Sequence, residues 1–251
     1  MTSFRQRLKN NERLLGTMVT LPSAAVAELL VGVGFDWLFL DAEHGPLQIS
    51  ELADLLRAVA GRIPCAVRTP ENSEAAIKQI LDLGADAIIV PQVNSPAEAA
   101  DVVKFAKYPP EGSRGVGLAR AHGYGLSFQE YVERANEDVA VIVQAEHIDA
   151  VNQIEEIVEV PGIDGVIIGP YDLSASLNKM GQVTDPAVTG AIDRVTEACQ
   201  NKGLALGIFG VSPAAVAPYM EQGYSMIIAG VDMTLLLNSA QSTLSTLREI
   251  G

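Results

Sequence analysis

Three ionisable residues, Asp41, Glu43 and His44, directly follow an apolar run at residues 37–40. Histidine exchanges protons near neutral pH, and a neighbouring carboxylate can orient its ring and raise its basicity. The spacing therefore predicts that His44 works as a general acid and base, with Asp41 as its partner. A simpler role stays open for Asp41, because a carboxylate that follows an apolar run often caps the next helix.

Other apolar runs also end in polar side chains. Arg68 follows the third run, Gln144 and Glu146 follow the fifth, and Asp172 follows the sixth. Residues two apart on a strand point to the same face, so Gln144 and Glu146 should converge. Glu146 and Asp172 offer the oxygen ligands that Mg²⁺ or Mn²⁺ prefers, whereas a single histidine is too few for a typical zinc site. Arg68 keeps its proton, so it can stabilise a developing oxyanion.

Groups for covalent catalysis are missing from these positions. A Schiff-base aldolase needs a lysine at the end of a strand, and no lysine of this chain ends one of the apolar runs, although Lys179 lies in the loop after the sixth. The GxSxG motif is absent, and neither Cys65 nor Cys199 ends a run. An enolate formed here would therefore need a metal ion to accept its charge. We expect no ligand role for His122, which lies in a glycine-flanked loop, or for His147, which points away from Glu146.

Eight short apolar runs alternate with helical segments along the chain. Four of them open alike, in GFDWLFLD, GADAIIVP, GIDGVIIGP and GYSMIIAG. Such alternation is typical of parallel βαβ units, and eight units in 251 residues predict an α/β fold with one (β/α)₈ TIM-barrel domain over residues 1–251. A doubly wound sheet is the alternative, although no GxGxxG follows the first run. The predicted strands cover residues 16–20, 36–40, 65–69, 87–90, 139–145, 165–168, 204–208 and 226–229.

Helix punctuation supports this alternation. Three Ser-Pro or Asp-Pro pairs place an N-cap before a proline at the first helical position, and Glu98 would complete a capping box with Ser95. Glycines that end helical segments are typical C-caps. The predicted N-caps are Ser95, Asp185 and Ser212, and the predicted C-cap glycines are Gly84, Gly203 and Gly223.

Composition narrows the partners to small molecules. The formal net charge of −14 repels a phosphate backbone and no Lys/Arg cluster offsets it, so we expect no nucleic-acid binding. Charged residues and glycines interrupt the longest apolar stretch, residues 24–40, so neither a signal peptide nor a membrane span is expected. Cys65 and Cys199 lie far apart, as two free, reduced cysteines would. These features indicate a cytoplasmic protein.

Six motifs lie between residues 40 and 177: LDAEHGP, AVRTP, GADAIIVPQVNSPAEA, YPPEGSRGVG, VIVQAEHIDAV and DGVIIGPYDLSASL. Together they resemble the HpcH/HpaI aldolases, which are metal-dependent class II pyruvate aldolases. QAE followed by GPYDLS is the specific combination, and the eight-unit pattern extends the likeness over essentially the whole chain. The resemblance implies a lyase that reversibly cleaves 4-hydroxy-2-oxo acids into pyruvate and an aldehyde through a metal-stabilised enolate. Oxaloacetate decarboxylation is the implied side reaction.

The resemblance also implies how pyruvate is held. Glu146 and Asp172 would bind a divalent metal, Mg²⁺, Mn²⁺ or Co²⁺, that chelates pyruvate through its carboxylate and keto oxygens. Arg68 would stabilise the enolate, and Gln144 would help to position the 2-oxo acid. Backbone amides of the turn formed by Gly169, Pro170, Tyr171 and Asp172 would hold the substrate carboxylate.

Proton transfer and assembly follow from the same resemblance. His44, paired with Asp41 and acting through a metal-bound water, would take the proton of the 4-hydroxyl group in cleavage. Asp82 of a neighbouring subunit would lie near His44. Members of the family commonly form hexamers, in which the segment from DMTLLLNSA to LSTLREIG would be a C-terminal helix exchanged with a neighbouring subunit; an ordinary closing helix of one barrel is the alternative.

The aldehyde is not encoded in these motifs. Tyr171 stands where other members carry Ala, Asn or Ser, and the segments LARAHGYG and NKMGQVTDP are expected to shape the aldehyde pocket, with Arg120 reaching inward. Two other functions stay open. A phosphosugar isomerase or synthase would need a phosphate cradle in GIFGVSP and IAGVDMT, and a non-catalytic ligand-binding barrel would leave the converging charges without a role.

Overall fold

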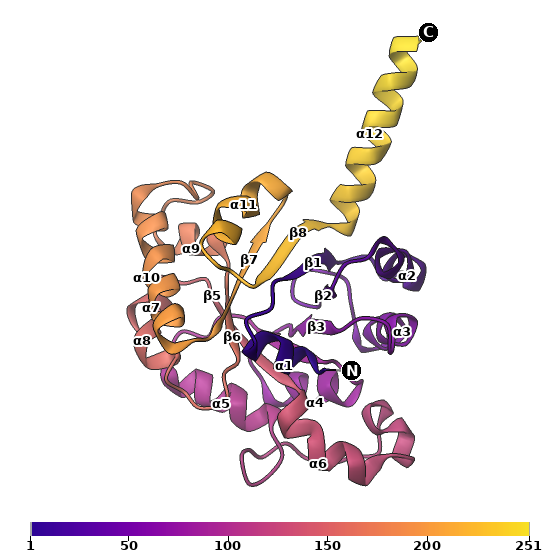
Figure 1. Cartoon of the computed structure of the whole chain (residues 1–251), viewed down its shortest axis with the longest axis vertical. Coiled ribbons are helices and arrows are strands. Elements are labelled where there is room, and N and C mark those ends of the chain that lie inside the picture. Colours follow the sequence, from indigo (N-terminus) through magenta and orange to yellow (C-terminus); the bar gives the residue numbers. More distant parts are fainter. Residues whose placement is uncertain (1, 251) are drawn as a thin grey trace.

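A computed structural model describes residues 2–250, and in them eight parallel strands close into a barrel in sequence order (Figure 1). Helices connect the strands and surround the barrel, so the predicted TIM barrel is confirmed and the doubly wound alternative is wrong. The strands are β1 (Leu14–Val19), β2 (Trp37–Asp41), β3 (Cys65–Arg68), β4 (Ala87–Val90), β5 (Ala140–Ala145), β6 (Gly165–Ile168), β7 (Ala205–Gly210) and β8 (Met226–Val231). The helices are α1 (Phe4–Lys9), α2 (Ala24–Val33), α3 (Ile49–Val59), α4 (Glu74–Asp82), α5 (Pro96–Ala106), the 3₁₀ helix η1 (Arg120–Gly125), α6 (Phe128–Asp138), α7 (Ile148–Asn152), α8 (Ile154–Ile157), α9 (Pro170–Ser176), α10 (Pro186–Lys202), α11 (Pro213–Glu221) and α12 (Asp232–Ile250).

Side chains of the strands alternate between the barrel interior and the layer under the helices. In β2, residues 37 and 39 belong to the interior cluster, whereas residues 38 and 40 pack in the outer layer. Because the period of a strand is two, the next inward position is Asp41, the last residue of β2. The same alternation brings Arg68 inward at the end of β3 and Gln144 inward near the end of β5. A regular strand pattern thus delivers polar groups to one rim of the barrel.

The N-terminal end of the barrel is covered by α1. The Phe4 ring packs on Trp37 with 5.4 Å between the ring centroids, and both side chains are buried. Gly16 of β1 makes room for this indole, because a Cβ atom there would come within 2.6 Å of the Trp37 Nε1 atom. The barrel interior at this end is therefore filled by core packing, and the polar rim lies at the opposite end of the strands.

The predicted helix caps are confirmed with one change. The three N-cap side chains accept hydrogen bonds from the first turns of α5, α10 and α11, each of which begins with proline. Glu98 does not close a capping box with Ser95, because its carboxylate accepts the backbone N–H of Asn94, one residue earlier. Gly84, Gly203 and Gly223 have φ angles of 86°, 73° and 89°, in the left-handed region that favours glycine.

The strands β7 and β8 extend two residues further than predicted. Both extensions contain a glycine, in FG at the end of β7 and GV at the end of β8, and such residues indicate turns when read locally. Pairing of Phe209 and Gly210 with β8 keeps the end of β7 in the sheet, and pairing of Val231 with Met18 of β1 does the same for β8. These longer strands raise the wall on one side of the barrel mouth.

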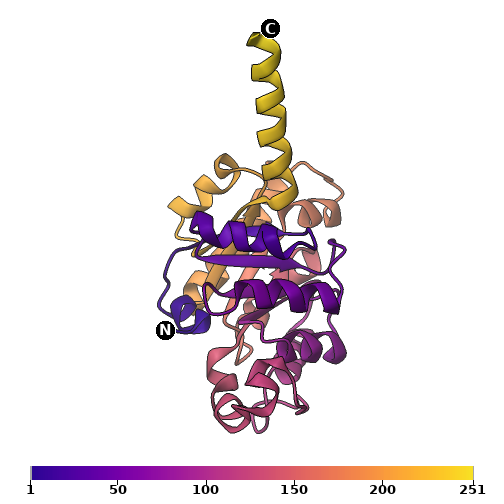
Figure 2. The ribbon, with the colours of Figure 1, turned by 90° about the vertical axis from the view of Figure 1, so that its right-hand side faces the viewer.

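The last helix, α12, projects away from the barrel in both views (Figures 1 and 2). Within the described chain, its first residue, Asp232, is the one buried position of the helix. Apolar side chains recur on α12 at spacings of four and three residues, as in a helix that packs on another helix. No described helix, α12 included, is long and apolar enough to cross a membrane. The exposed residues at these spacings are Met233, Leu237, Ala240, Leu244 and Leu247.

Candidate active site

A cavity of about 350 Å³ opens at the C-terminal ends of the strands. Its two sides differ in chemistry. Strands β2, β3 and β5 and the turn after β6 supply the polar side chains of one side, together with the apolar Phe39, Ile167 and Ile168 of β2 and β6, whereas β1, β7 and β8 line the other side with mainly apolar side chains. The structure brings most of the predicted site residues together here, since the lining includes Asp41, His44, Arg68, Gln144, Gly169, Pro170, Tyr171 and Asp172.

Arg68 and Asp41 form a bidentate pair within the rim. They are register partners at the ends of β3 and β2, and Nε and Nη2 of Arg68 donate to the two carboxylate oxygens of Asp41 at 2.9 and 2.8 Å. Burial alone would raise the pKa of Asp41, but the hydrogen bonds and charge of Arg68 outweigh it and hold that pKa below its ordinary value. Asp41 is thus an ionised partner that fixes the guanidinium.

This pair replaces the expected pairing of Asp41 with the His44 ring. Both oxygens of Asp41 are taken by Arg68, and Asp41 also accepts the backbone N–H groups of Glu43 and His44 at 3.1 and 3.3 Å. The His44 side chain is 66% exposed, and its Nε2 atom lies 3.8 Å from Oε2 of Glu43. Asp41 therefore shapes the turn that carries His44 without holding its imidazole.

Glu43 lies at this site, although the sequence predicted no role for it. Its Oε2 atom lies 3.1 Å from Nη1 of Arg68, the same nitrogen that donates to the Gln144 amide oxygen at 3.4 Å. Burial raises the pKa of Glu43; the charges of Arg68 and His44 oppose the rise, and those of Asp41 and Asp172 reinforce it. The sequence feature that could have indicated this role is the position of Glu43 between Asp41 and His44, in the loop between β2 and α3.

Gln144, in β5, and Glu146, directly after this strand, lie side by side, as their spacing predicts. The Gln144 amide donates to one carboxylate oxygen of Glu146, and the backbone N–H of Gln92 donates to the other at 2.8 Å. Burial, reinforced by the charges of Glu43 and Asp172 and opposed by the Gln92 N–H, raises the pKa of Glu146 to about 7. Among residues 2–250, no cationic side chain donates a hydrogen bond to this buried carboxylate.

The turn after β6 comes close to this pair because residue 169 is glycine. A Cβ atom on Gly169 would lie 3.0 Å from the Glu146 Cβ and 3.1 Å from the Gln144 Nε2. Pro170 then begins α9, and the exposed side chain of Asp172 in the first turn of this helix lines the cavity. Asp172 lies close enough for its charge to raise the pKa of Glu146.

These carboxylates fit a hard divalent cation. The charge of Asp172 disfavours the ionised forms of Glu43 and Glu146, and the charge of Glu43 also disfavours that of Glu146, so a nearby cation would offset this repulsion. Among residues 2–250 no three His, Cys, Asp or Glu side chains form a ready metal cluster. The predicted pair, Glu146 and Asp172, would leave the remaining coordination positions to water and substrate.

Asp82 and the other two histidines lie outside this cavity. Asp82 ends α4, and its carboxylate accepts Nη2 of Arg114 at 2.7 Å, while the Arg114 guanidinium lies 4.6 Å from the ring centroid of Tyr108. His147 caps α7 through its Nδ1 atom, and His122 is buried in η1. Within one chain, Asp82 is thus an ion-pair partner of Arg114 and does not meet His44.

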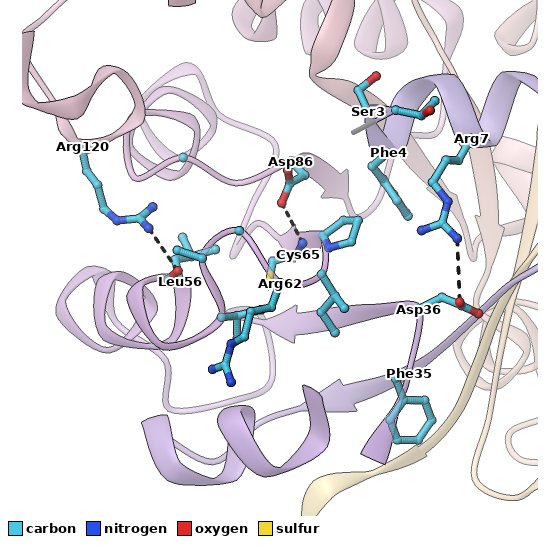
Figure 3. A pocket seen from close by; sticks show the side chains of 17 residues that line it. Ser3, Phe4, Arg7, Phe35, Asp36, Leu56, Arg62, Cys65, Asp86 and Arg120 are labelled. Atoms are coloured by element: carbon cyan, nitrogen blue, oxygen red, sulfur yellow. Dashed lines mark hydrogen bonds and ion pairs between the residues drawn. The ribbon is translucent and has the colours of Figure 1, made fainter. Parts of the chain in front are cut away.

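Arg120 does not reach inward, contrary to the expectation from the sequence. It lines a second cavity, of about 460 Å³, near the N-terminal ends of β2, β3 and β4 (Figure 3). Its guanidinium donates to the carbonyls of Leu83 at 2.6 Å and Leu56 at 3.1 Å. These carbonyls belong to the C-terminal ends of α4 and α3, where the helix dipole favours positive charge. Arg120 therefore ties two helix ends together.

The two segments that were expected to shape the aldehyde pocket also lie elsewhere. Of the described chain, neither residues 118–125 nor residues 178–186 line the cavity at the barrel mouth. The ends of β7 and β8 and the residues that follow them, the alternative phosphate cradle, supply the apolar residues Phe209, Val211, Val231 and Met233 instead. That lining favours an organic substituent over a phosphate group.

Fold and site together define a TIM-barrel enzyme whose reactive groups lie at the C-terminal ends of its strands. The chain belongs to the HpcH/HpaI aldolase/citrate lyase family, which matches residues 15–239, and it is an aldolase, that is, a carbon–carbon lyase. The non-catalytic barrel considered from the sequence is therefore excluded.

Named relatives cover nearly the whole chain. A hydroxypyruvate/pyruvate aldolase of Pseudomonas aeruginosa is 38% identical over 239 residues, 94% of this chain and 89% of that protein. A 4-hydroxy-2-oxo-heptane-1,7-dioate aldolase of Escherichia coli is 37% identical over 243 residues, 96% of this chain and 92% of that protein. The crystal structure of a family protein from Burkholderia cenocepacia superposes with a TM-score of 0.95 at 36% identity, covering 99% of this chain and all of that one.

Proposed function

We propose that this aldolase is a class II enzyme that reversibly cleaves 4-hydroxy-2-oxo acids into pyruvate and an aldehyde. The observation that carries the proposal is the polar side of the cavity, where a guanidinium fixed by Asp41 lies beside the Gln144 amide and the Glu43 carboxylate. The names of the two curated relatives, one acting with pyruvate and one on a 4-hydroxy-2-oxo acid, agree with this reaction.

Arg68 would supply the fixed positive charge of the reaction. Cleavage of the carbon–carbon bond leaves pyruvate as an enolate, whose negative charge is absent from the bound substrate. Asp41 holds two nitrogens of the guanidinium, so the third, Nη1, is already aimed at the Gln144 side of the cavity. Such a donor stabilises the developing charge without having to reorganise. Oxaloacetate decarboxylation would follow as a side reaction because it forms the same enolate.

His44 would move the proton. Its exposed imidazole lies at the rim of the cavity, where it can accept the proton of the 4-hydroxyl group in cleavage and return it in synthesis. The Glu43 carboxylate, 3.8 Å from the ring, would stabilise the imidazolium formed in the first of these steps. Tyr171 lines the same rim and would limit the access of water.

Glu146 and Asp172 would hold a divalent ion, Mg²⁺ or Mn²⁺ with Co²⁺ as a further candidate. When bound, this ion supplies a Lewis acid for the carboxylate and keto oxygens of the 2-oxo acid. Gln144 would keep the Glu146 carboxylate in place through its amide hydrogen bond. The close approach of the Gly169 turn leaves room for backbone groups, and no side chain, beside this carboxylate.

Proton NMR of pyruvate in D₂O tests this function without a guess about the aldehyde. With Mg²⁺ or Mn²⁺ we expect loss of the methyl signal by deuterium exchange, and EDTA should abolish it. Glu146→Gln should lose the exchange, whereas the matched control Glu156→Gln, an exposed glutamate of α8, should keep it. If neither methyl exchange nor cleavage of 4-hydroxy-2-oxopentanoate occurred with either metal, the proposal would be overturned and sugar phosphates would be tested next.

We infer further that the protein, acting as one barrel domain over residues 1–251, assembles into a homo-oligomer, a hexamer by resemblance to its family. The exposed apolar residues of α12 are unusual for a helix that has only water around it. Asp82 keeps a quarter of its side chain exposed beside Arg114. An assembly would bury the α12 residues and bring Asp82 near His44 of a neighbouring subunit. Within one chain, Asp82 does not lie near His44.

A further inference from the structure

The apolar side of the mouth cavity points to the class of aldehyde that the enzyme uses. We propose that this side accepts uncharged aldehydes with aliphatic or aromatic substituents and rejects aldehydes that carry a distal carboxylate. This inference rests on the proposed aldolase function and deepens it. This side, the aldehyde wall, consists of Met18, Thr20, Phe209, Val211, Val231 and Met233.

The position of the aldehyde wall follows from the division of the cavity. Pyruvate needs charged and hydrogen-bonding groups for its carboxylate and its enolate, and these lie on β2, β3, β5 and the turn after β6. The new carbon–carbon bond forms on the methyl carbon of pyruvate, so the substituent of the aldehyde extends away from that polar side. In this cavity most of the remaining lining is the aldehyde wall, built by β1, β7, β8 and the residues that follow them.

No cation of the described cavity lining is available to a distal carboxylate on this wall. The Arg68 guanidinium is the one arginine in the lining, and all three of its nitrogens have partners in Asp41, Glu43 and Gln144. Arg120 lies at the other end of the strands, and Lys179, in the loop after α9, pairs with Asp185 at 3.1 Å. His44 belongs to the opposite, polar side of the mouth.

An acidic side chain lies directly behind the aldehyde wall. Asp232, directly before Met233, is buried, and its carboxylate accepts the backbone N–H and hydroxyl groups of Thr20 at 3.0 and 2.8 Å and the N–H of Leu21 at 2.8 Å. The Thr20 hydroxyl has therefore already given its one proton to Asp232. A substrate carboxylate on this wall would lose its water, find no donor and face a like charge, which is strongly unfavourable.

This chemistry separates the chain from one of its named relatives. The retro-aldol cleavage of 4-hydroxy-2-oxo-heptane-1,7-dioate, the substrate in that relative's name, gives pyruvate and succinic semialdehyde, whose carboxylate lies two methylene groups from the aldehyde. Apolar walls discriminate modestly among uncharged substituents, so the enzyme should tolerate a range of apolar aldehydes. The discrimination that we expect is between charged and uncharged substituents.

A matched pair of aldehydes tests the inference on the full chain with Mg²⁺ or Mn²⁺. Succinic semialdehyde and 4-methylpentanal have the same length, and an isopropyl group replaces the carboxylate in the second. We expect kcat/KM for addition of pyruvate to be higher for 4-methylpentanal by about tenfold or more, since a buried carboxylate without a partner is strongly disfavoured. Equal values, or a preference for succinic semialdehyde, would overturn the inference while leaving the aldolase function in place.

Substitution at the wall gives an independent readout. Val211 follows β7 and is 55% exposed, so an arginine there is compatible with the fold. Val211→Arg should shift the ratio of the two kcat/KM values towards succinic semialdehyde by about tenfold. The control Val33→Arg, on an α2 residue that is 65% exposed and outside the cavity lining, should leave the ratio unchanged. An unchanged ratio in Val211→Arg would contradict the placement of the aldehyde substituent. Absence of turnover with every aldehyde and of methyl exchange in pyruvate would overturn the aldolase proposal itself.

Discussion

Asp41 and Arg68 are register partners on neighbouring strands, and two parallel hydrogen bonds of 2.9 and 2.8 Å join their side chains. Both side chains are buried, where an unpaired charge would be costly, and their mutual hydrogen bonds keep the pair ionised. Because the fork of the guanidinium is fixed on one side, Nη1 has one direction left, towards Gln144 and Glu43. Asp41 thus acts on the reaction through Arg68 and is a positioning residue.

Removing the guanidinium should remove most of the enolate stabilisation. We expect Arg68→Ala to lower kcat by a factor on the order of 10² or more, as loss of an oxyanion donor does. Arg68→Lys keeps the charge but cannot make the bidentate contact to Asp41, so its kcat should lie between that of the wild type and that of Arg68→Ala. Steady-state cleavage of a 4-hydroxy-2-oxo acid measures both, with circular dichroism as the control for folding. A near-normal kcat in Arg68→Ala would remove this residue from the mechanism.

The same pair should show strong coupling in stability. Asp41→Ala or Arg68→Ala alone leaves one buried charge without its partner, which costs roughly 3–5 kcal/mol of unfolding free energy. The double substitution removes both charges, so its cost should be well below the sum of the two single costs. Urea denaturation of the three variants and the wild type gives this coupling. Additive costs would mean that the hydrogen bonds between Arg68 and Asp41 contribute little to the free energy of unfolding.

Local patterns predicted which residues reach the rim, because the alternation within a strand needs no information from the rest of the chain. Asp41, Arg68 and Gln144 were placed correctly for that reason. The partner of Asp41 was not, since it depends on the register between β2 and β3, which puts Arg68 beside it and leaves His44 on the following turn. Arg120 was misplaced for the same reason: its contacts at Leu56 are 64 residues away in sequence.

The aldehyde wall had no sequence signal of its own. Met18 and Phe209 lie on strands whose other inward residues fill the barrel, so their types do not distinguish a cavity lining from core. They line a cavity because of where their strands end at the barrel mouth. Strands β7 and β8 run further than their glycine-containing ends indicate. Apolar binding surfaces of this kind become visible only with the fold.

The raised pKa of Glu146, about 7 against an ordinary value of 4.5, should make the metal-free protein less stable as pH rises. Between these two values the folded protein holds a proton that the unfolded chain has already released, so the free energy of unfolding falls with increasing pH. The full effect is at most roughly 3 kcal/mol. Thermal melts in EDTA from about pH 5 to about pH 7.5 should therefore decline more for the wild type than for Glu146→Gln.

Added Mg²⁺ or Mn²⁺ should reverse this decline, because a cation stabilises the ionised carboxylate and binds only the folded protein. The control Glu156→Gln should follow the wild type in every buffer. Superimposable pH profiles for the wild type and Glu146→Gln would show that the Glu146 carboxyl group titrates at its ordinary value.

The exposed residues of α12 should control assembly. A lysine at both Leu237 and Leu244, which lie seven residues apart and so on one face, would place two charges in any apolar contact made by this helix. We expect light scattering to show a smaller particle for this variant than for the wild type. The control with lysines at Ser239 and Ser242, away from that face, should keep the wild-type mass. A wild type that is monomeric would contradict both the assembly and the proposed place of Asp82 near a neighbouring His44.

Two glycines that look alike in the sequence should respond to alanine in opposite ways. At Gly16 a Cβ atom would come within 2.6 Å of the buried Trp37 ring, and this ring is held by Phe4 and by its own hydrogen bond to the Leu14 carbonyl. Overpacking of this kind costs about 1–3 kcal/mol. At Gly32, within α2, no atom lies within 4 Å of the added carbon, so alanine should raise the unfolding free energy by about 0.5–1 kcal/mol. Urea denaturation of Gly16→Ala and Gly32→Ala checks both signs, and a stabilised Gly16→Ala would mean that the indole can move out of the barrel interior.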